Sequence, residues 1–329
     1  MKFSYFIVFF LIFFNACAEK MNIVFTSDEK FGQHTCVTMA SILKNSAPDD
    51  EFAFYIVDRG INQNDKQKIE NLKKLFKPFD IKYVTVPEHL IKRLKIAPNC
   101  IEKRYGNLMV YMRLFIPDLL PEVDKALFLD ADLYIKESIK EFYSYDISNY
   151  YALGSVEVLF ILDKENYLRT LRYKQPNPGK MTFNNGVVLL NLKKIREDNI
   201  VDTLIEKANE FSQFKANGDR VFDGNEETVA NNVFGDKALV RNNLKYNFRC
   251  HPMLMTLPSV RHLVNEATVE NAVIYHFISA EKPWCTWMRH PHLKQILKDY
   301  FTLTDLVGYK PQGIIETIKE IIRRWWVTL

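Results

Sequence analysis

The stretch Ala126-Leu127-Phe128-Leu129-Asp130-Ala131-Asp132 joins an apolar run to two carboxylates one residue apart. The apolar run predicts a buried strand. Alternate side chains of a strand point to the same side, so Asp130 and Asp132 would project to the same side where the strand ends. Two anionic oxygen ligands suit a hard divalent cation, and such a cation suits a phosphate group. The stretch therefore indicates a metal-assisted reaction on a phosphorylated substrate.

The composition is typical of a folded protein with a large core. The chain has 329 residues, of which 47% are hydrophobic, 13% aromatic and 26% charged, which allows one large domain or one domain with an elaborate second half. The net charge of +4 is too small to indicate nucleic-acid binding, and it is compatible with an anionic ligand or membrane. The five cysteines are scattered without a C-x-x-C pair, so neither a disulfide framework nor a zinc site is indicated, and we expect a reduced compartment.

Residues 1–20 have two interpretations. Lys2, an apolar block over 6–14 and the small residues Ala16-Cys17-Ala18 are typical of a secretory signal, and the block is short for a membrane span. This interpretation implies an exported or membrane-anchored protein. The alternative is that Met21 is the true start, as in a cytoplasmic enzyme whose first strand begins at once. We therefore leave residues 1–20 out of the fold prediction.

Strands alternate with helices in the first half of the chain. Buried strands are predicted over 23–26, 52–57 and 81–86, with helices over 33–44 and 62–76 between them. This order predicts an α/β fold with a mostly parallel sheet, in which ligands bind beyond the carboxyl ends of the strands. Thr26-Ser27-Asp28 lies at such an end, as does the Asp-x-Asp motif, so we expect the two to share one site.

Two polar stretches accompany later apolar strands. Asn184-Asn185-Gly186 precedes a strand predicted over 186–192, and we expect a loop there that is either a plain turn or an amide that binds a sugar. His276 lies in an apolar run over 272–277 and is followed by Lys282-Pro283-Trp284. A lone histidine is more often structural, but a neutral imidazole can complete a metal shell and a lysine can bind a phosphate.

The C-terminal residues 313–329 have the pattern of an amphipathic helix with one apolar and one basic face. Such a stripe usually packs on the protein's own core. The terminal position, the basic charge and the tryptophans favour an interfacial helix in peripheral contact with a membrane. We expect a helical tail over 291–329.

Five stretches in consistent order resemble glycosyltransferase family 8, which includes glycogenin and bacterial lipopolysaccharide galactosyl- and glucosyltransferases. The stretches are Ile23-Val24-Phe25-Thr26-Ser27-Asp28, Tyr111-Met112-Arg113-Leu114, and residues 127–132, 183–192 and 276–284. The resemblance covers residues 21–290, and five ordered motifs are far more specific than one. It implies a GT-A fold, in which a Rossmann-like half that binds the nucleotide is merged with a half that binds the acceptor.

The resemblance also implies an activity and a site. The activity is retaining transfer of a hexose, galactose or glucose, from a UDP-sugar to a saccharide acceptor, with Mn²⁺ or Mg²⁺ bound. The implied metal ligands are Asp130, Asp132 and His276. The residues implied to bind the UDP-hexose are Thr26, Ser27, Asp28 and nearby Phe31 around the uridine, Arg113 and Ala131 along the donor, Asn184 at the sugar and Lys282 at the diphosphate.

One departure from the family concerns the reacting carbon. Many members carry Asp-Gln-Asp before Leu-Asn, whereas this chain reads Glu226-Glu227-Thr228-Val229-Ala230-Asn231. Aligned on Asn231, Glu226 replaces the first acid and Glu227 replaces the glutamine. We take both as candidate catalytic residues. Glu227 would stabilise an oxocarbenium-like centre, attack it as carboxylates do in retaining glycosidases, or sit mispositioned in a slow enzyme.

Two rival functions stay open on the sequence alone. A phosphatase of the haloacid-dehalogenase type also places Asp-x-Asp after an apolar strand, but normally after its first strand, whereas Asp130 follows three others. The second rival is a catalytically inactive relative that binds carbohydrate, supported only by Glu227. For a transferase, the basic surface and tail suit a lipid-linked saccharide such as a lipopolysaccharide core, and a cytoplasmic enzyme would work at the inner membrane face.

Overall fold

The computed structural model describes residues 19–96, 108–157, 181–212, 226–241, 244–250, 269–278, 282–284 and 291–310. The signal-like block over 6–14 and the amphipathic pattern over 313–329 lie outside these residues. In the part of the chain that is described, no helix combines the length and the apolar character that a membrane span requires.

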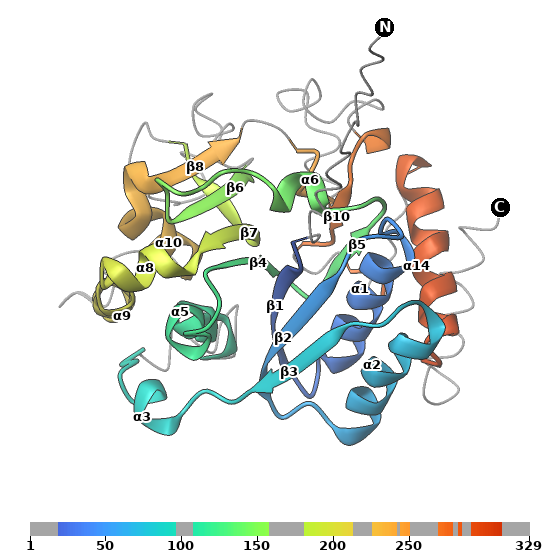
Figure 1. Ribbon diagram of the computed structural model, residues 1–329, viewed down its shortest axis with the longest axis horizontal. Coiled ribbons are helices and arrows are strands. Elements are labelled where there is room, and N and C mark those ends of the chain that lie inside the picture. Colours follow the sequence, from blue (N-terminus) through green and yellow to red (C-terminus); the bar gives the residue numbers. More distant parts are fainter. Residues whose placement is uncertain are drawn as a thin grey trace, which may run out of the picture.

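Seven strands form the central sheet (Figure 1). In spatial order they are β3 (Asp80–Val84), β2 (Phe52–Arg59), β1 (Met21–Asp28), β4 (Lys125–Leu129), β7 (Phe183–Asn191), β6 (Ala152–Val156) and β8 (Ala238–Arg241). Of these seven, β7 alone runs antiparallel to its neighbours, β4 and β6. The predicted α/β fold with a mostly parallel sheet is therefore confirmed.

A second, smaller sheet continues from the end of β4. It consists of β5 (Leu133–Ile135), β10 (Ile274–His276) and β9 (Phe248–Arg249), in that order. The strand β10 is antiparallel to β5 and pairs His276 with Leu133, the residue after Asp132. The apolar run predicted over 272–277 is thus a strand of the small sheet, and this pairing places the imidazole beside the Asp-x-Asp motif.

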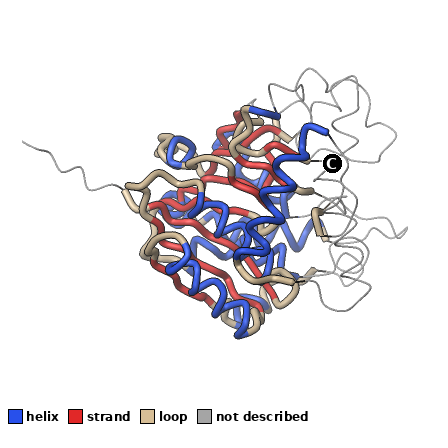
Figure 2. The backbone as a smooth tube through the Cα atoms, turned by 90° about the vertical axis from the view of Figure 1, so that its right-hand side faces the viewer, coloured by secondary structure: helices blue, strands red, loops and turns tan. Residues whose placement is uncertain are grey.

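Helices cover both faces of the central sheet. On one face lie α1 (Gly32–Lys44), α2 (Gln63–Leu75) and α14 (Lys294–Leu306), with α1 in contact with both others. On the other lie η1 (Leu108–Phe115), α5 (Ile116–Leu119), α8 (Leu192–Glu197), α9 (Ile200–Phe211) and α10 (Glu226–Phe234). Figure 2 looks onto the first of these faces, with helices in blue and strands in red. The remaining helical turns are α3 (Glu88–Ile91), α6 (Lys140–Tyr143), η2 (Gly235–Lys237) and η3 (Pro291–Leu293).

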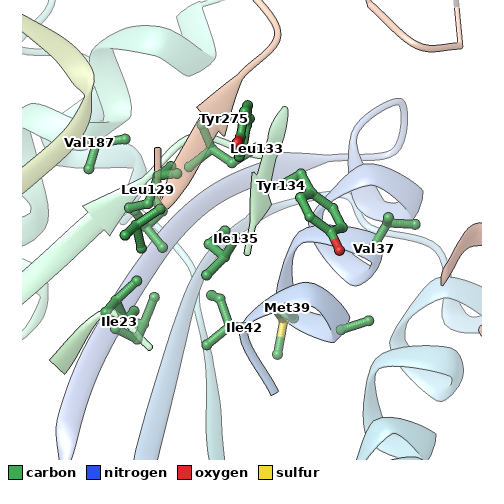
Figure 3. Packing of buried hydrophobic residues seen from close by; sticks show 14 of the residues in the cluster. Ile23, Val37, Met39, Ile42, Leu129, Leu133, Tyr134, Ile135, Val187 and Tyr275 are labelled. Carbon is green, nitrogen blue, oxygen red and sulfur yellow. The ribbon is translucent and has the colours of Figure 1, made fainter. Parts of the chain in front are cut away.

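The strands are apolar on both sides because each side faces a separate core. Along β4, Leu127 and Leu129 belong to the cluster under α1, whereas Ala126 and Phe128 belong to the cluster under α9 and α10. This alternation is the period-2 geometry of a strand, and burial on both sides is usual for parallel sheets. In Figure 3, Leu129 and the small-sheet residue Tyr275 lie in the same packed cluster, so the two sheets share a core.

The start of β7 differs from the sequence prediction. The strand begins at Phe183, so Asn184-Asn185-Gly186 lies inside it and is no loop. Backbone pairing of Val156 with Phe183 and a hydrogen bond from Asp130 N to Gly186 O at 2.8 Å hold this polar stretch in the sheet. Because β7 runs antiparallel to β4, its first residues lie beside the end of β4, where the Asp-x-Asp motif emerges.

Polar side chains of α1 hold the connection between β4 and β5. The Thr38 hydroxyl lies 2.8 Å from Ala131 O and 3.0 Å from Leu133 O, and the side chain is fully buried. One turn later, Ser41 Oγ accepts from Ile135 N at 3.0 Å. The helix therefore fixes the backbone of the Asp-x-Asp turn through direct side-chain hydrogen bonds.

Thr38→Val tests this contact. Valine keeps the shape but leaves buried carbonyl groups without the hydroxyl, so we expect a loss of roughly 1–3 kcal/mol in the free energy of unfolding, measured in urea. The control is Thr304→Val, because the buried Thr304 hydroxyl donates to Tyr300 O of its own helix at 2.9 Å. Equal losses in the two variants would contradict a special role for Thr38.

Candidate functional site

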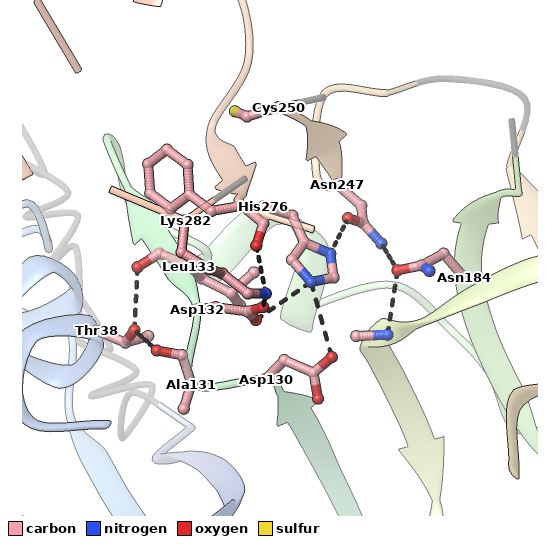
Figure 4. Close-up of polar contacts among 12 residues, drawn as sticks. Thr38, Asp130, Ala131, Asp132, Leu133, Asn184, Asn247, Cys250, His276 and Lys282 are labelled. Carbon is pink, nitrogen blue, oxygen red and sulfur yellow. Dashed lines mark hydrogen bonds and ion pairs between the residues drawn. The ribbon is translucent and has the colours of Figure 1, made fainter. Parts of the chain in front are cut away.

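Three potential metal ligands converge where β4 ends and the small sheet begins. One ligand atom each of Asp130, Asp132 and His276 lie within 4.8 Å of one another. His276 Nε2 is 3.2 Å from Asp132 Oδ1 and 3.7 Å from Asp130 Oδ2 (Figure 4). The structure thus brings together the three residues that the sequence predicts as ligands, although they are up to 146 positions apart in the chain (276 − 130).

The donor set fits a divalent cation. Asp132 Oδ1 is buried, and no hydrogen-bond donor among the described residues reaches it. A bound cation would supply the missing partner, and two carboxylates with one imidazole suit Mn²⁺ or Mg²⁺. The lack of a side chain at Gly186 leaves space for the three ligands to converge. A Cβ built there would lie 2.7 Å from Asp130 Oδ2 and would overlap the His276 ring.

Basic side chains neutralise both carboxylates. Arg113 in η1 donates from NH2 to Asp130 Oδ1 at 2.8 Å and from NH1 to Asn185 O at 2.8 Å. Lys282 Nζ donates to Asp132 Oδ2. Burial alone would raise the pKa of Asp132, but Lys282 and His276 beside it hold that pKa well below its usual range. Both acids are thus positioned through one oxygen while the other faces the cluster.

The end of β1 lies beside the end of β4, because the two strands are parallel and Val24 pairs with Phe128. Thr26 is partly buried, and Ser27 is fully buried and accepts from the Thr35 hydroxyl at 2.9 Å. Asp28 Oδ1 accepts from the backbone N–H groups of Lys30 and Phe31 at 3.0 and 3.1 Å, which shapes the turn into α1. The Phe31 ring is 40% exposed and is therefore available for stacking on a ligand.

An aromatic stack that the sequence analysis missed anchors the segment bearing Lys282. The His34 ring of α1 stacks on Trp284 with centroids 3.5 Å apart, and Trp284 stacks on Tyr300 of α14 at 5.9 Å. Phe31 meets His34 edge-on at 5.9 Å. Burial lowers the pKa of His34 to about 3, so the ring is neutral. The stack thereby joins the exposed ring at the end of β1 to the lysine.

The two glutamates of α10 reach the site from the other side. Glu226 is buried, its Oε1 lies 3.9 Å from Arg113 NH2, and its Oε2 has no hydrogen-bond partner among the described residues. Glu227 Oε2 accepts from Asn184 Nδ2 and Asn185 N, each at 2.9 Å. Burial, followed by the nearby Glu157 carboxylate, raises the pKa of Glu227 to about 8. Glu227 is therefore mainly protonated at neutral pH.

A buried polar network around Asn184 was not predicted. Asn184 Nδ2 also lies 3.2 Å from Glu157 Oε2, and Arg249 of β9 pairs with Glu157. On its other side, Asn184 Oδ1 accepts from Asn247 Nδ2 at 2.9 Å, and Asn247 Oδ1 contacts His276 Nδ1 at 3.0 Å. A buried charge pair and two adjoining amides of this kind carry no recognisable spacing in the sequence.

Gly186→Ala is the sharpest test of the ligand cluster. The added methyl would push apart His276 and Asp130, so we expect the affinity for Mn²⁺, measured by calorimetry, to fall at least tenfold. A matched control is Gly60→Ala, because no atom lies within 4 Å of the Cβ added there, although the positive φ of +107° carries a cost in stability. Unchanged Mn²⁺ affinity in folded Gly186→Ala would contradict this placement of the ion.

Comparisons with known proteins agree on one family. The model of "Glycosyl transferase family 8" matches residues 22–288. General stress protein A of Bacillus subtilis is 26% identical over 280 residues, which are 83% of this chain and 91% of that protein. Lipopolysaccharide 1,3-galactosyltransferase of Salmonella typhimurium is 26% identical over 279 residues, 83% of this chain and 76% of that protein.

Solved structures support the same fold. The galactosyltransferase LgtC, crystallised with donor and acceptor sugar analogs, aligns with a TM-score of 0.67 and 22% identity, covering 89% of this chain and 98% of LgtC. The predicted GT-A fold is therefore confirmed. The family match also favours sugar transfer over the phosphatase alternative. The chain belongs to glycosyltransferase family 8.

Proposed function

We propose that this glycosyltransferase moves a hexose, galactose or glucose, from a UDP-sugar to a saccharide acceptor with retention of configuration and with Mn²⁺ or Mg²⁺ bound. The observation that carries the proposal is the convergence of Asp130, Asp132 and His276 within 4.8 Å at the end of β4. Lys282 and Phe31 flank this cluster. A lysine can bind a diphosphate, and an exposed aromatic ring can stack on a nucleotide base.

The mechanism follows from the charge that develops on the leaving group. As the bond between sugar and UDP stretches, the departing phosphate oxygen becomes negative. Asp130, Asp132 and His276 would hold a divalent cation, which would supply Lewis-acid stabilisation of that charge. Lys282 is tied to Asp132 and so stands beside the same position, where its ammonium group would bind the diphosphate. Arg113 orients Asp130 through the 2.8 Å hydrogen bond from NH2 to Oδ1.

Glu227 bears on how configuration is retained. Its pKa is raised to about 8, so at neutral pH it is a weak nucleophile and resembles the neutral glutamine of other family members. Its Oε2 is also occupied by two N–H donors. These observations favour direct attack by the acceptor on the side of the departing UDP, with Glu227 as a neutral hydrogen-bonding group.

The acceptor is the least constrained part of the proposal. Lipopolysaccharide galactosyl- and glucosyltransferases occur among the relatives, the latter in Escherichia coli at 23% identity. They support a saccharide acceptor such as a lipopolysaccharide core. Peripheral contact with a membrane through the amphipathic segment 313–329 stays a prediction.

UDP release from a panel of UDP-sugars in the presence of Mn²⁺ tests the function, because transferases of this kind hydrolyse their donor slowly without an acceptor. We expect release from UDP-galactose or UDP-glucose, its abolition by a chelator, and a loss of at least 100-fold in kcat for Asp132→Asn. Glu206→Gln, on the exposed side of α9, is the control. Metal-dependent UDP binding without turnover of any donor would instead support an inactive carbohydrate-binding relative.

The raised pKa of Glu227 predicts a pH dependence of stability. The folded state binds the Glu227 proton more tightly than the unfolded state, whose pKa is near 4.5, so stability falls as pH rises from 4.5 through about 8. Glu227→Gln removes this loss. We expect its Tm to exceed that of wild type by roughly 2–5 °C at pH 9, with a smaller difference at pH 5. Parallel Tm curves for the two proteins would contradict the assignment, and Glu206→Gln again serves as the control.

A further inference from the structure

The amides of Asn184 and Asn247 form a directional chain that starts at a backbone group. Gly186 N–H can only donate, so the Asn184 atom that it meets at 3.2 Å is Oδ1. The Nδ2 group of Asn184 then faces Glu227 Oε2 at 2.9 Å and Glu157 Oε2 at 3.2 Å, which are acceptors. Backbone and carboxylates together therefore fix which way this amide points.

Asn247 links the fixed amide of Asn184 to His276, the predicted metal ligand, and its own orientation is set by the same hydrogen bonds. Its Nδ2 donates to Asn184 Oδ1 at 2.9 Å, which leaves its Oδ1 3.0 Å from His276 Nδ1. An amide oxygen only accepts, so Nδ1 donates its proton to Asn247, and Nε2 is the ring nitrogen that faces Asp130 and Asp132 (Figure 4). Asn247 is 1% exposed, which shields this bond from competing water.

We propose that Asn247 is a positioning residue that presents His276 Nε2 to the cation. The inference rests on the proposed function only through the bound metal. Asn184 acts as a second positioning residue, because both of its Nδ2 hydrogens and both of its Oδ1 lone pairs are already used within the protein. A direct bond from Asn184 to the sugar, as the family resemblance implies, would break one of these contacts.

The test measures Mn²⁺ binding alone, by electron paramagnetic resonance of the free ion, on the full chain without donor sugar. Asn247→Ala removes the acceptor for Nδ1, and we expect a 10- to 100-fold loss of affinity. Asn247→Asp keeps an acceptor there, so its affinity should stay within a few fold of wild type. Equal affinity of wild type and folded Asn247→Ala would overturn the inference.

Asn191→Ala is the matched control. Asn191 is the last residue of the same strand, β7, at the end opposite to the site. Its side chain accepts from Lys194 N at 3.0 Å and donates to Ile147 O at 3.0 Å. This variant also loses amide hydrogen bonds, so its Tm should fall while its Mn²⁺ affinity does not change. A drop in Mn²⁺ affinity like that of Asn247→Ala would overturn the inference, since it would reflect general destabilisation.

A measurement on wild type keeps the test decisive even where Asn247→Ala does not fold. The ¹⁵N shifts of the His276 ring, assigned by their loss in His276→Gln, should show a proton on Nδ1, whereas an unprotonated Nδ1 would overturn the inference. Failure of the proposed function is distinguishable: a wild type that binds Mn²⁺ but transfers no sugar refutes the sugar transfer alone. A wild type that binds no Mn²⁺ overturns both.

Discussion

Electrostatic repulsion between two closely spaced carboxylates is the constraint on which the site depends. Asp130 and Asp132 each place one oxygen, and His276 one ring nitrogen, within 4.8 Å of one another at the end of β4. Such groups separate or take up protons unless the surrounding structure holds them. Arg113, Lys282 and Asn247 each hold one of the three, and they come from η1, from residues 282–284 and from the residue before β9. The site can therefore form only after both sheets have assembled.

The sequence predicts best those elements whose signal is local. The apolar runs of β1, β2 and β4 and the helical periodicity of α1 and α2 lie close to where the structure has them. The start of β7 was misjudged because Asn184 and Asn185 disfavour strands by propensity. In the folded protein Glu227 accepts from the Asn184 side chain and the Asn185 backbone, and Arg113 donates to Asn185 O, so tertiary hydrogen bonds outweigh the local preference.

The same distinction separates the parts of the site. Asp130 and Asp132 follow from a strand pattern, and His276 with Lys282 from ordered motifs of a family. Asn247 had no such signal, because it precedes a strand of only two residues and acts through the pairing of that strand with β10. A role that depends on contacts between distant segments leaves no periodicity to find, and the same holds for the buried Arg249–Glu157 pair.

The neutrality of His34 has a consequence for the environments in which the protein can work. With its pKa near 3, the ring does not gain charge between mildly acidic and alkaline conditions, and its stack on Trp284 stays the same throughout. Acidification, which can disrupt contacts made by a histidine that gains charge, therefore leaves the packing of Trp284 on α1 unchanged. Lys282, two residues before Trp284, thus keeps this support over a wide range of pH.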